Sequence, residues 1–95
     1  MDMFQFLSDA WNIRKIANEL NRSHLIQCTV DYDWYGSRGT PYVSARCDRG
    51  LYILPFGGEI ETRVNHKILK LSDASYNAKV HANQVTTELS KPTAN

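Results

Sequence analysis

Two alternating stretches joined by a glycine-bracketed turn constrain the fold of this chain most strongly. Apolar and polar residues alternate from Ile26 to Tyr35, and β-branched and aromatic residues are frequent there. A second stretch of this kind runs from Thr40 to Asp48. Gly36 and Gly39 bracket the connection and supply the positive φ that hairpin loops need. The pattern predicts an antiparallel β-hairpin.

The symmetry of this turn also predicts the register of the hairpin. A tip at Ser37 and Arg38 brings four apolar pairs into opposition: Cys28 with Cys47, Val30 with Ala45, Tyr32 with Val43, and Trp34 with Pro41. A register that gathers apolar residues on one face is self-consistent. Because Cys28 and Cys47 lie on this inner face, we expect buried free thiols, with a directly cross-strand disulfide as the alternative.

A second turn, Asp48-Arg49-Gly50, predicts a third strand that ends near Phe56, with Gly50 in the left-handed bulge position. The same alternation predicts these further pairs: Cys47 with Leu51, Ala45 with Ile53, Val43 with Pro55, Arg46 with Tyr52, Ser44 with Leu54, and Tyr42 with Phe56. Because proline cannot donate a ladder hydrogen bond, we expect Pro55 at a sheet edge or a strand end.

Helical spacing appears at both ends of the chain. From Met3 to Asn21, apolar residues recur every three or four positions: Met3, Phe6, Ala10, Ile13, Ala17 and Leu20 form one stripe, which Phe4, Leu7, Trp11 and Ile16 widen. We expect this helix to pack on the core, with a helix-mediated dimer as the alternative. Its expected cap is Asp2 or Ser8, and its expected stop is Asn21.

The C-terminal half predicts two more strands and a second helix. Glu59 to Val64 alternates like a strand, and Lys67 to Leu71 is a short further strand; a helical stripe over the same residues is the alternative. After an N-cap at Ser72-Asp73, a helix reaches Leu89. The fold class is therefore α+β, in the order α-β-β-β-(β)-α, with a three- to four-stranded antiparallel meander between two helices. Residues 1–89 form one domain and residues 90–95 a flexible tail.

Composition excludes several functional classes. Eleven Lys and Arg residues against ten Asp and Glu residues give a net charge of +1 without a basic block, which argues against a dedicated nucleic-acid binder. The start of the chain is acidic and lacks a sustained apolar run, so we expect neither a signal peptide nor a membrane span. The two cysteines, without a secretion signal, favour a soluble cytoplasmic protein. No metal-ligand spacing, cofactor motif or catalytic set is recognisable, so we expect no enzyme, metal or cofactor.

The outer face of the predicted sheet carries the strongest candidate site. It gathers large apolar and cationic side chains that could bind a protein partner: Tyr35, Tyr42, Arg46, Tyr52, Leu54 and Phe56, with Arg38 at the tip of the first turn. We therefore expect a non-enzymatic module that binds another protein or itself as a homodimer, unless a helix covers this face. Chain size alone adds the expectation of an accessory or inhibitor protein of a phage or mobile element.

Two other functions remain as alternatives. The first is nucleic-acid binding through Arg38, Arg46 and Arg49 with the sheet tyrosines as stacking surfaces. The second is a small metal-dependent hydrolase that uses Asp31 and Asp33, which share one face of the first strand.

Overall fold

The computed structural model describes residues 3–35, 40–56, 59–65, 67–72 and 77–91. A long N-terminal helix, α1 (Met3–His24), precedes five strands and a C-terminal helix. The remaining elements are β1 (Cys28–Tyr35), β2 (Thr40–Cys47), a 3-10 turn (Asp48–Gly50), β3 (Leu51–Phe56), β4 (Glu59–Val64), β5 (Lys67–Ser72) and α2 (Ala78–Ser90). The predicted α+β class is confirmed, and both candidate strands between residues 59 and 72 are formed.

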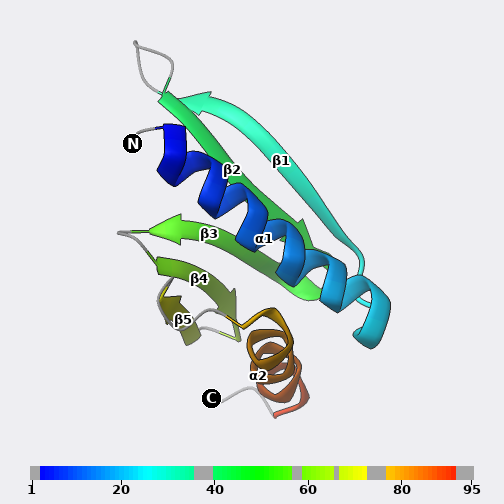
Figure 1. Ribbon diagram of the computed structural model, residues 1–95. Coiled ribbons are helices and arrows are strands. Elements are labelled where there is room, and N and C mark those ends of the chain that lie inside the picture. The colour runs from blue at the N-terminus through cyan, green and yellow to red at the C-terminus, as the bar shows by residue number, and fades with distance from the viewer. Residues whose placement is uncertain (1–2, 36–39, 57–58, 66, 73–76, 92–95) are drawn as a thin grey trace.

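The five strands form one antiparallel meander in the order β1-β2-β3-β4-β5. Both helices pack on the same face of this sheet, α1 across β1 and β2 and α2 near β4 (Figure 1). The shared core joins residues of α1, the sheet and α2: Ile13, Ile16, Leu20, Val43, Ile53, Ile60, Val85 and Leu89. The molecule thus has two layers, and neither helix covers the opposite face of the sheet.

The register of the first hairpin is confirmed. Cys28 pairs with Cys47 and Tyr32 pairs with Val43 in the β1–β2 ladder, as the alternation predicted. The turn residues 36–39, including Arg38, lie outside the described residues. The ladder is consistent with the side-chain pattern of the strands, because a slip by one residue would turn every inner side chain outward.

The second hairpin is shorter than predicted. Its ladder joins only three pairs, from Cys47 with Leu51 to Ala45 with Ile53. Beyond Ile53 the two strands diverge, as Figure 1 shows, so the pairs predicted for Pro55, Leu54 and Phe56 with β2 are not part of the ladder. The predicted pairs assumed that the β2–β3 ladder continues regularly to Phe56. Because strands twist, two strands that are joined by a turn at one end can separate toward the other end.

Pro55 lies at one of the two expected places, next to the end of β3, which finishes at Phe56. β3 is the central strand of the sheet, not an edge, and Pro55 pairs with Ile60 of β4. The β2–β3 ladder has already ended at Ile53 when the chain reaches Pro55. A residue without an N–H is therefore tolerated in a central strand because one neighbour has moved away.

Helix α1 ends one turn later than predicted. Asn21 is not the stop, since the helix runs on to His24 and the chain leaves it through Leu25, whose φ is 56°. The Asn21 side chain instead accepts a hydrogen bond from the backbone N–H of Cys28 at 2.9 Å. The N–H of Ile26 donates to the carbonyl of Leu20 at 3.0 Å, which fastens the helix to the start of β1.

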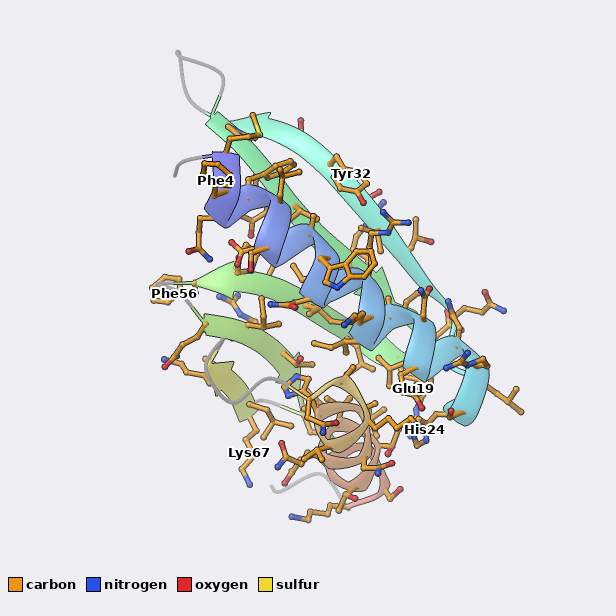
Figure 2. The ribbon with its side chains drawn as sticks, in the orientation of Figure 1. Phe4, Glu19, His24, Tyr32, Phe56 and Lys67 are labelled. Atoms are coloured by element: carbon orange, nitrogen blue, oxygen red, sulfur yellow. A yellow bond between two sulfur atoms is a disulfide. The ribbon has the colours of Figure 1, made fainter. Side chains whose placement is uncertain are left out.

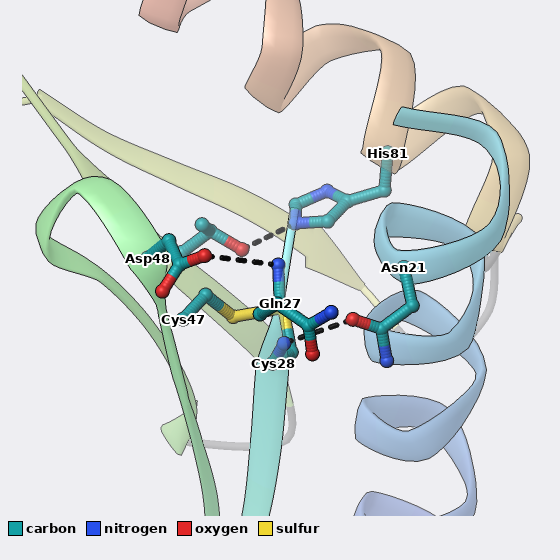
Figure 3. Close-up of a disulfide and its surroundings, with 7 residues drawn as sticks. Asn21, Gln27, Cys28, Cys47, Asp48 and His81 are labelled. Atoms are coloured by element: carbon teal, nitrogen blue, oxygen red, sulfur yellow. Dashed lines mark hydrogen bonds between the residues drawn. A yellow bond between two sulfur atoms is a disulfide. The ribbon is translucent and has the colours of Figure 1, made fainter. Parts of the chain in front are cut away.

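Cys28 and Cys47 form a disulfide, so the expectation of free thiols is wrong (Figure 3). The ladder brings their Cα atoms to 4.0 Å, which is close to the spacing of a non-hydrogen-bonded antiparallel pair. Next to the disulfide, the N–H of Asp48 donates to the carbonyl of Gln27 at 2.9 Å. The opposition of the two cysteines in the predicted register was therefore a better guide to their state than their position on the inner face.

Helix α2 begins at Ala78, later than predicted, and its N-cap is Asn77 rather than Ser72-Asp73. The side-chain oxygen of Asn77 accepts from the N–H of Val80 at 3.1 Å. Ser72 is the last residue of β5, and Asp73 lies outside the described residues. An asparagine at this position satisfies a backbone donor that a helix start leaves unpaired.

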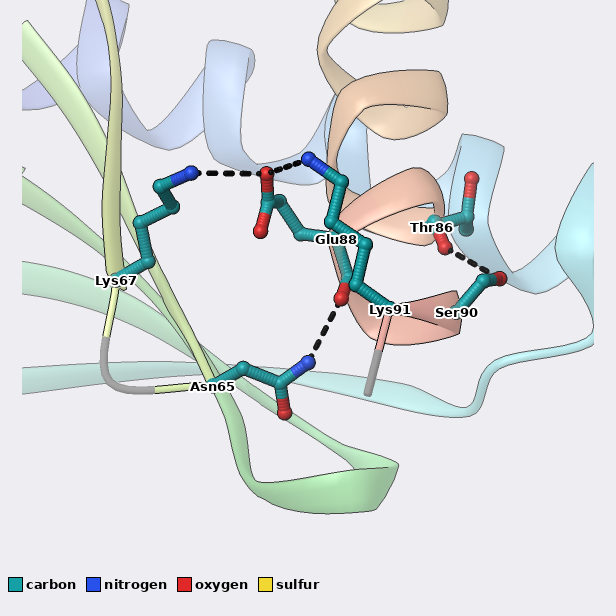
Figure 4. Close-up of polar contacts among 6 residues, drawn as sticks. All are labelled: Asn65, Lys67, Thr86, Glu88, Ser90 and Lys91. Carbon is teal, nitrogen blue, oxygen red and sulfur yellow. Dashed lines mark hydrogen bonds and ion pairs between the residues drawn. The ribbon is translucent and has the colours of Figure 1, made fainter. Parts of the chain in front are cut away.

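The far end of α2 is fastened to the β4–β5 turn through Glu88 (Figure 4). Its carboxylate lies 3.2 Å from the ammonium of Lys67 and 2.9 Å from that of Lys91. Its backbone carbonyl accepts from the side-chain amide of Asn65 at 2.7 Å. These two cations bind the carboxylate and hold the pKa of Glu88 below its ordinary value.

Candidate interaction surfaces

The first half of α1 exposes a run of large apolar side chains. The exposed fractions are 55% for Met3, 85% for Phe4, 55% for Leu7 and 59% for Trp11. Figure 2 labels Phe4 at the start of the helix, on the side of the sheet that the helices cover. We call these four residues the α1 stripe.

The α1 stripe points away from the sheet because of the helical period. Each residue advances the direction of the side chain by ~100°, so the four members fall within an arc of roughly 100°. The fully buried residues Ile13, Ile16 and Leu20 lie on the opposite side of the same helix. The sequence assigned both groups to one wide core-facing stripe. That interpretation is wrong for Met3, Phe4, Leu7 and Trp11, which are exposed. The apolar arc was wider than one face of the helix, and this was the signal that part of it is uncovered.

Neighbouring residues frame the α1 stripe. The ammonium of Lys15 lies 5.2 Å from the ring centroid of Trp11, a cation–π contact on the solvent side of the helix. Tyr32 of β1 extends the apolar surface toward the sheet edge, since its ring is 54% exposed and packs edge-on against Phe6 at 6.3 Å. The apolar surface therefore continues from α1 onto β1.

The second half of α1 has a different surface. Arg14, Lys15 and Arg22 are exposed there, whereas Glu19 is largely buried. The Ser23 hydroxyl donates to the Glu19 carboxylate at 2.8 Å, and the Arg22 guanidinium lies 3.4 Å from it. Mainly because of the hydrogen bond from Ser23, the pKa of Glu19 is lower than its ordinary value. The exposed side of α1 thus changes from apolar to basic along the helix.

The outer face of the sheet holds the residues that the sequence singled out, but not as one apolar patch. Tyr52 and Phe56 are exposed, and Leu54 is half-buried between them. Their partners on β4 are charged, because Tyr52 pairs with Arg63, Leu54 with Glu61 and Phe56 with Glu59. The predicted pairs of β3 were all with β2, so the charged row on β4 beside it is a finding of the structure.

The remaining predicted site residues are scattered. Tyr35 lies in β1 and Tyr42, half-buried, lies in β2. The guanidinium of Arg46 forms an ion pair with Asp31 at 2.9 Å, the cross-strand pairing that its position favoured. Arg49, in the 3-10 turn that follows β2, donates to the backbone carbonyl of Leu89 at 3.3 Å. The two described arginines of the nucleic-acid alternative are therefore each engaged in an intramolecular contact.

No group of three or more potential metal ligands comes together in the described part of the chain. Asp31 is paired with Arg46, and the Glu61 carboxylate accepts from Arg63 at 3.1 Å. Glu59 lies 3.9 Å from Lys70. Asp31, one of the two aspartates of the hydrolase alternative, is thus engaged with a cation, as are Glu59 and Glu61.

His81 is a buried polar residue that the sequence did not single out. Its Nε2 lies 2.6 Å from the hydroxyl of Thr62, and both side chains are fully buried between α2 and β4. Burial lowers the pKa of His81 to about 4, so the imidazole is neutral near pH 7. The helical spacing of α2 placed this residue next to Ala82, but spacing alone did not distinguish a core histidine from a surface one.

An open groove of about 460 Å³ lies between β5 and α2. Leu69 and Val80 contribute its apolar part, while Lys70, Gln84 and Glu88 contribute charged and polar groups. Four of the exposed large apolar side chains of the described residues lie together on the α1 stripe, whereas Leu69 and Val80 are the apolar side chains that line the groove.

Comparisons with protein-family models, with curated proteins and with solved structures found no match to this chain. Neither helix of the described residues has the length and apolar character required to cross a membrane. The class that the geometry defines is a two-layer α+β domain with helices on one face of a five-stranded antiparallel sheet.

Proposed function

We propose that this chain is a non-enzymatic protein-binding module whose contact surface is the α1 stripe. The observation that carries the proposal is the exposure of Met3, Phe4, Leu7 and Trp11 on one side of one helix. Single exposed apolar residues are ordinary, whereas a contiguous exposed patch of several hundred Å² is typical of an interaction site.

The type of residue supports the same function. Trp11 and Phe4 are large aromatic side chains, and aromatic residues are enriched in the centres of protein interfaces. The spacing of Phe4, Leu7 and Trp11 matches the i, i+3, i+7 anchors by which an amphipathic helix enters an apolar groove. The basic residues that follow, Arg14 and Lys15, suit the polar rim of such an interface.

The outer sheet face is the second surface of this proposal. Tyr52 and Phe56 are exposed on it and could add contacts with a partner, as the sequence suggested. The charged row on β4 makes this face less apolar than the α1 stripe, so we assign it the minor role. A role as an accessory or inhibitor protein of a phage or mobile element would be compatible with such a module.

The nucleic-acid and hydrolase alternatives have less support. Arg46 and Arg49 are each engaged in an intramolecular contact, and Asp31 is paired with Arg46. The cytoplasmic location remains a prediction. The Cys28–Cys47 disulfide weighs against it, since disulfides persist mainly in oxidising compartments.

A comparison of matched variants tests the proposal. The tagged chain would be used to capture proteins from the organism that encodes it, beside a Leu7→Arg and a Tyr52→Arg variant. We expect Leu7→Arg to abolish specific capture and self-association, and Tyr52→Arg to retain them. Both substitutions add one cation at a partly exposed apolar position. Binding that persists in Leu7→Arg would contradict the assignment of the surface to α1.

A further inference from the structure

We infer that the α1 stripe binds a second copy of this chain, with the two α1 helices antiparallel about a two-fold axis near Leu7. This inference rests on the proposed function and names the partner. In the resulting homodimer the two helices pack against each other and the sheets lie on the outside, because the stripe points away from its own sheet.

The spacing of the α1 stripe is self-complementary in this arrangement. With Leu7 at the axis and a rise of ~1.5 Å per residue, Met3 and Phe4 lie roughly 5 Å to one side along the helix and Trp11 about 6 Å to the other. Reversing the second helix places Trp11 of each copy beside Met3 and Phe4 of the other. A two-fold interface uses the same patch on both copies, and this patch matches its own reversed image.

The exposed area is adequate for a reversible dimer. Side chains of this size present ~200 Å² each when fully exposed, so the four residues offer about 500 Å² per copy at their observed exposures. Two copies would bury about 1,000 Å², the size at which specific interfaces begin. The aliphatic stem of Lys15 adjoins Trp11 of the stripe and would enlarge this area.

The charges are compatible with pairing. Arg14 is the first exposed cation after the stripe, and in the antiparallel arrangement the two copies of Arg14 lie about 21 Å apart along the helix axis. That separation exceeds the Debye length of ~8 Å at physiological salt, so their repulsion is screened. The net charge of +1 adds little repulsion between whole molecules.

Sedimentation equilibrium of the full chain is the first test. We expect the average mass to rise from 10.9 kDa toward twice that value between 1 µM and about 500 µM protein. This range brackets the micromolar affinity of a small interface. Leu7→Arg and Trp11→Ala should each raise the dimer dissociation constant at least tenfold. Val80→Arg, an exposed apolar position on α2, is the matched control and should leave it unchanged. A monomer at every concentration, or a dimer that resists both stripe variants, overturns the inference.

Cysteine cross-linking tests the antiparallel geometry. Leu7→Cys places a thiol at the axis, whereas Asn18→Cys lies on the same exposed side of α1 but roughly 33 Å from its counterpart. Mild oxidation should link Leu7→Cys dimers and leave Asn18→Cys unlinked. Linkage of both variants, or of neither, overturns the arrangement. If the chain is monomeric yet captures another protein through the stripe, the dimer fails and the proposed function stands. If the stripe variants change neither property, both fail.

Discussion

The hydroxyl of Thr62 lies 2.6 Å from Nε2 of His81, and this contact joins strand β4 to helix α2 inside the core. Both side chains are fully buried, and burial lowers the pKa of His81 to about 4. Among the described residues, the second ring nitrogen, Nδ1, has no hydrogen-bond partner. A protonated imidazole at this position would be a buried charge without a counter-ion.

The free energy of unfolding should therefore decrease as the pH is lowered, because His81 takes up a proton more readily in the unfolded chain. The pKa is about 4 in the folded protein and 6.5 in the unfolded chain, so the unfolded state binds the proton more readily. The loss begins as the pH falls below 6.5 and is complete near pH 4, at a total of about 3 kcal/mol. Urea denaturation at pH 7.5, 5.5 and 4.5 measures it.

A His81→Gln variant is the control for this pH dependence. It should be less stable than the wild type near pH 7 but should lose less stability between pH 6.5 and pH 4.5. The carboxylate pKa values of Glu19 and Glu88 are lowered from 4.5, so the stability that these two residues contribute is lost only as the pH falls below about that value. An equal pH dependence in wild type and His81→Gln would exclude His81 as the cause.

The disulfide should be present in the protein as isolated and should stabilise it. Cys28 and Cys47 are 19 residues apart, and closing a loop of that length restricts the unfolded chain by about 3 kcal/mol. Reduction should lower the Tm by more than ~10 °C. Thiol titration in denaturant without reductant should find no free thiol before reduction and two after it; two reactive thiols before reduction would refute the disulfide.

The backbone conformation of Leu25 leads us to expect that a substitution at this position stabilises the protein. Its φ is 56° and its side chain is 88% exposed, so it is held in the left-handed region without a packing gain. Leu25→Gly should raise the free energy of unfolding by about 1 kcal/mol, because glycine adopts this conformation without a steric cost. Leu25→Asn should have an intermediate effect. Chemical denaturation of the three proteins measures the order, and a destabilised glycine variant would contradict it.

Two leucines of α1 provide a direct test of which side of the helix is core. Leu20 is fully buried and Leu7 is 55% exposed. Leu20→Ala should cost about 2–5 kcal/mol of stability, since it leaves a cavity. Leu7→Ala should cost less than about 1 kcal/mol in the monomer, measured at low protein concentration. Equal losses at both positions would place Leu7 in the core.

The residues of β1 and β2 determined their own register. Alternation from Cys28 to Tyr35 determined which side chains share a face, and the position of the turn selected one pairing, so the ladder was predictable residue by residue. The same pairing placed Cys28 opposite Cys47, which is the geometry of the observed disulfide. The positions of the two strands between residues 59 and 72 were predictable for the same reason.

The boundaries of the helices were less predictable. Asn21 and Asn77 are both typical of helix ends, yet only Asn77 caps one, while Asn21 binds the N–H of Cys28 from inside α1. The partner of Asn21 lies in β1, so the sequence pattern of the helix carries no information about this contact. Boundary residues therefore depended on contacts made after the chain had folded back.

Only the tertiary structure decided which apolar side chains are covered by other elements. The periodicity of α1 showed that Trp11 and Leu20 are apolar residues of a helix, but both fit one wide stripe. Which of the two faces the sheet depends on how the helix is rotated about its own axis. That rotation follows from the packing of Ile13 and Ile16 onto Val43 and Ile53, residues that are distant in sequence. Local pattern determined the elements and the register. Long-range packing decided that both helices share one face of the sheet and that the α1 stripe remains exposed.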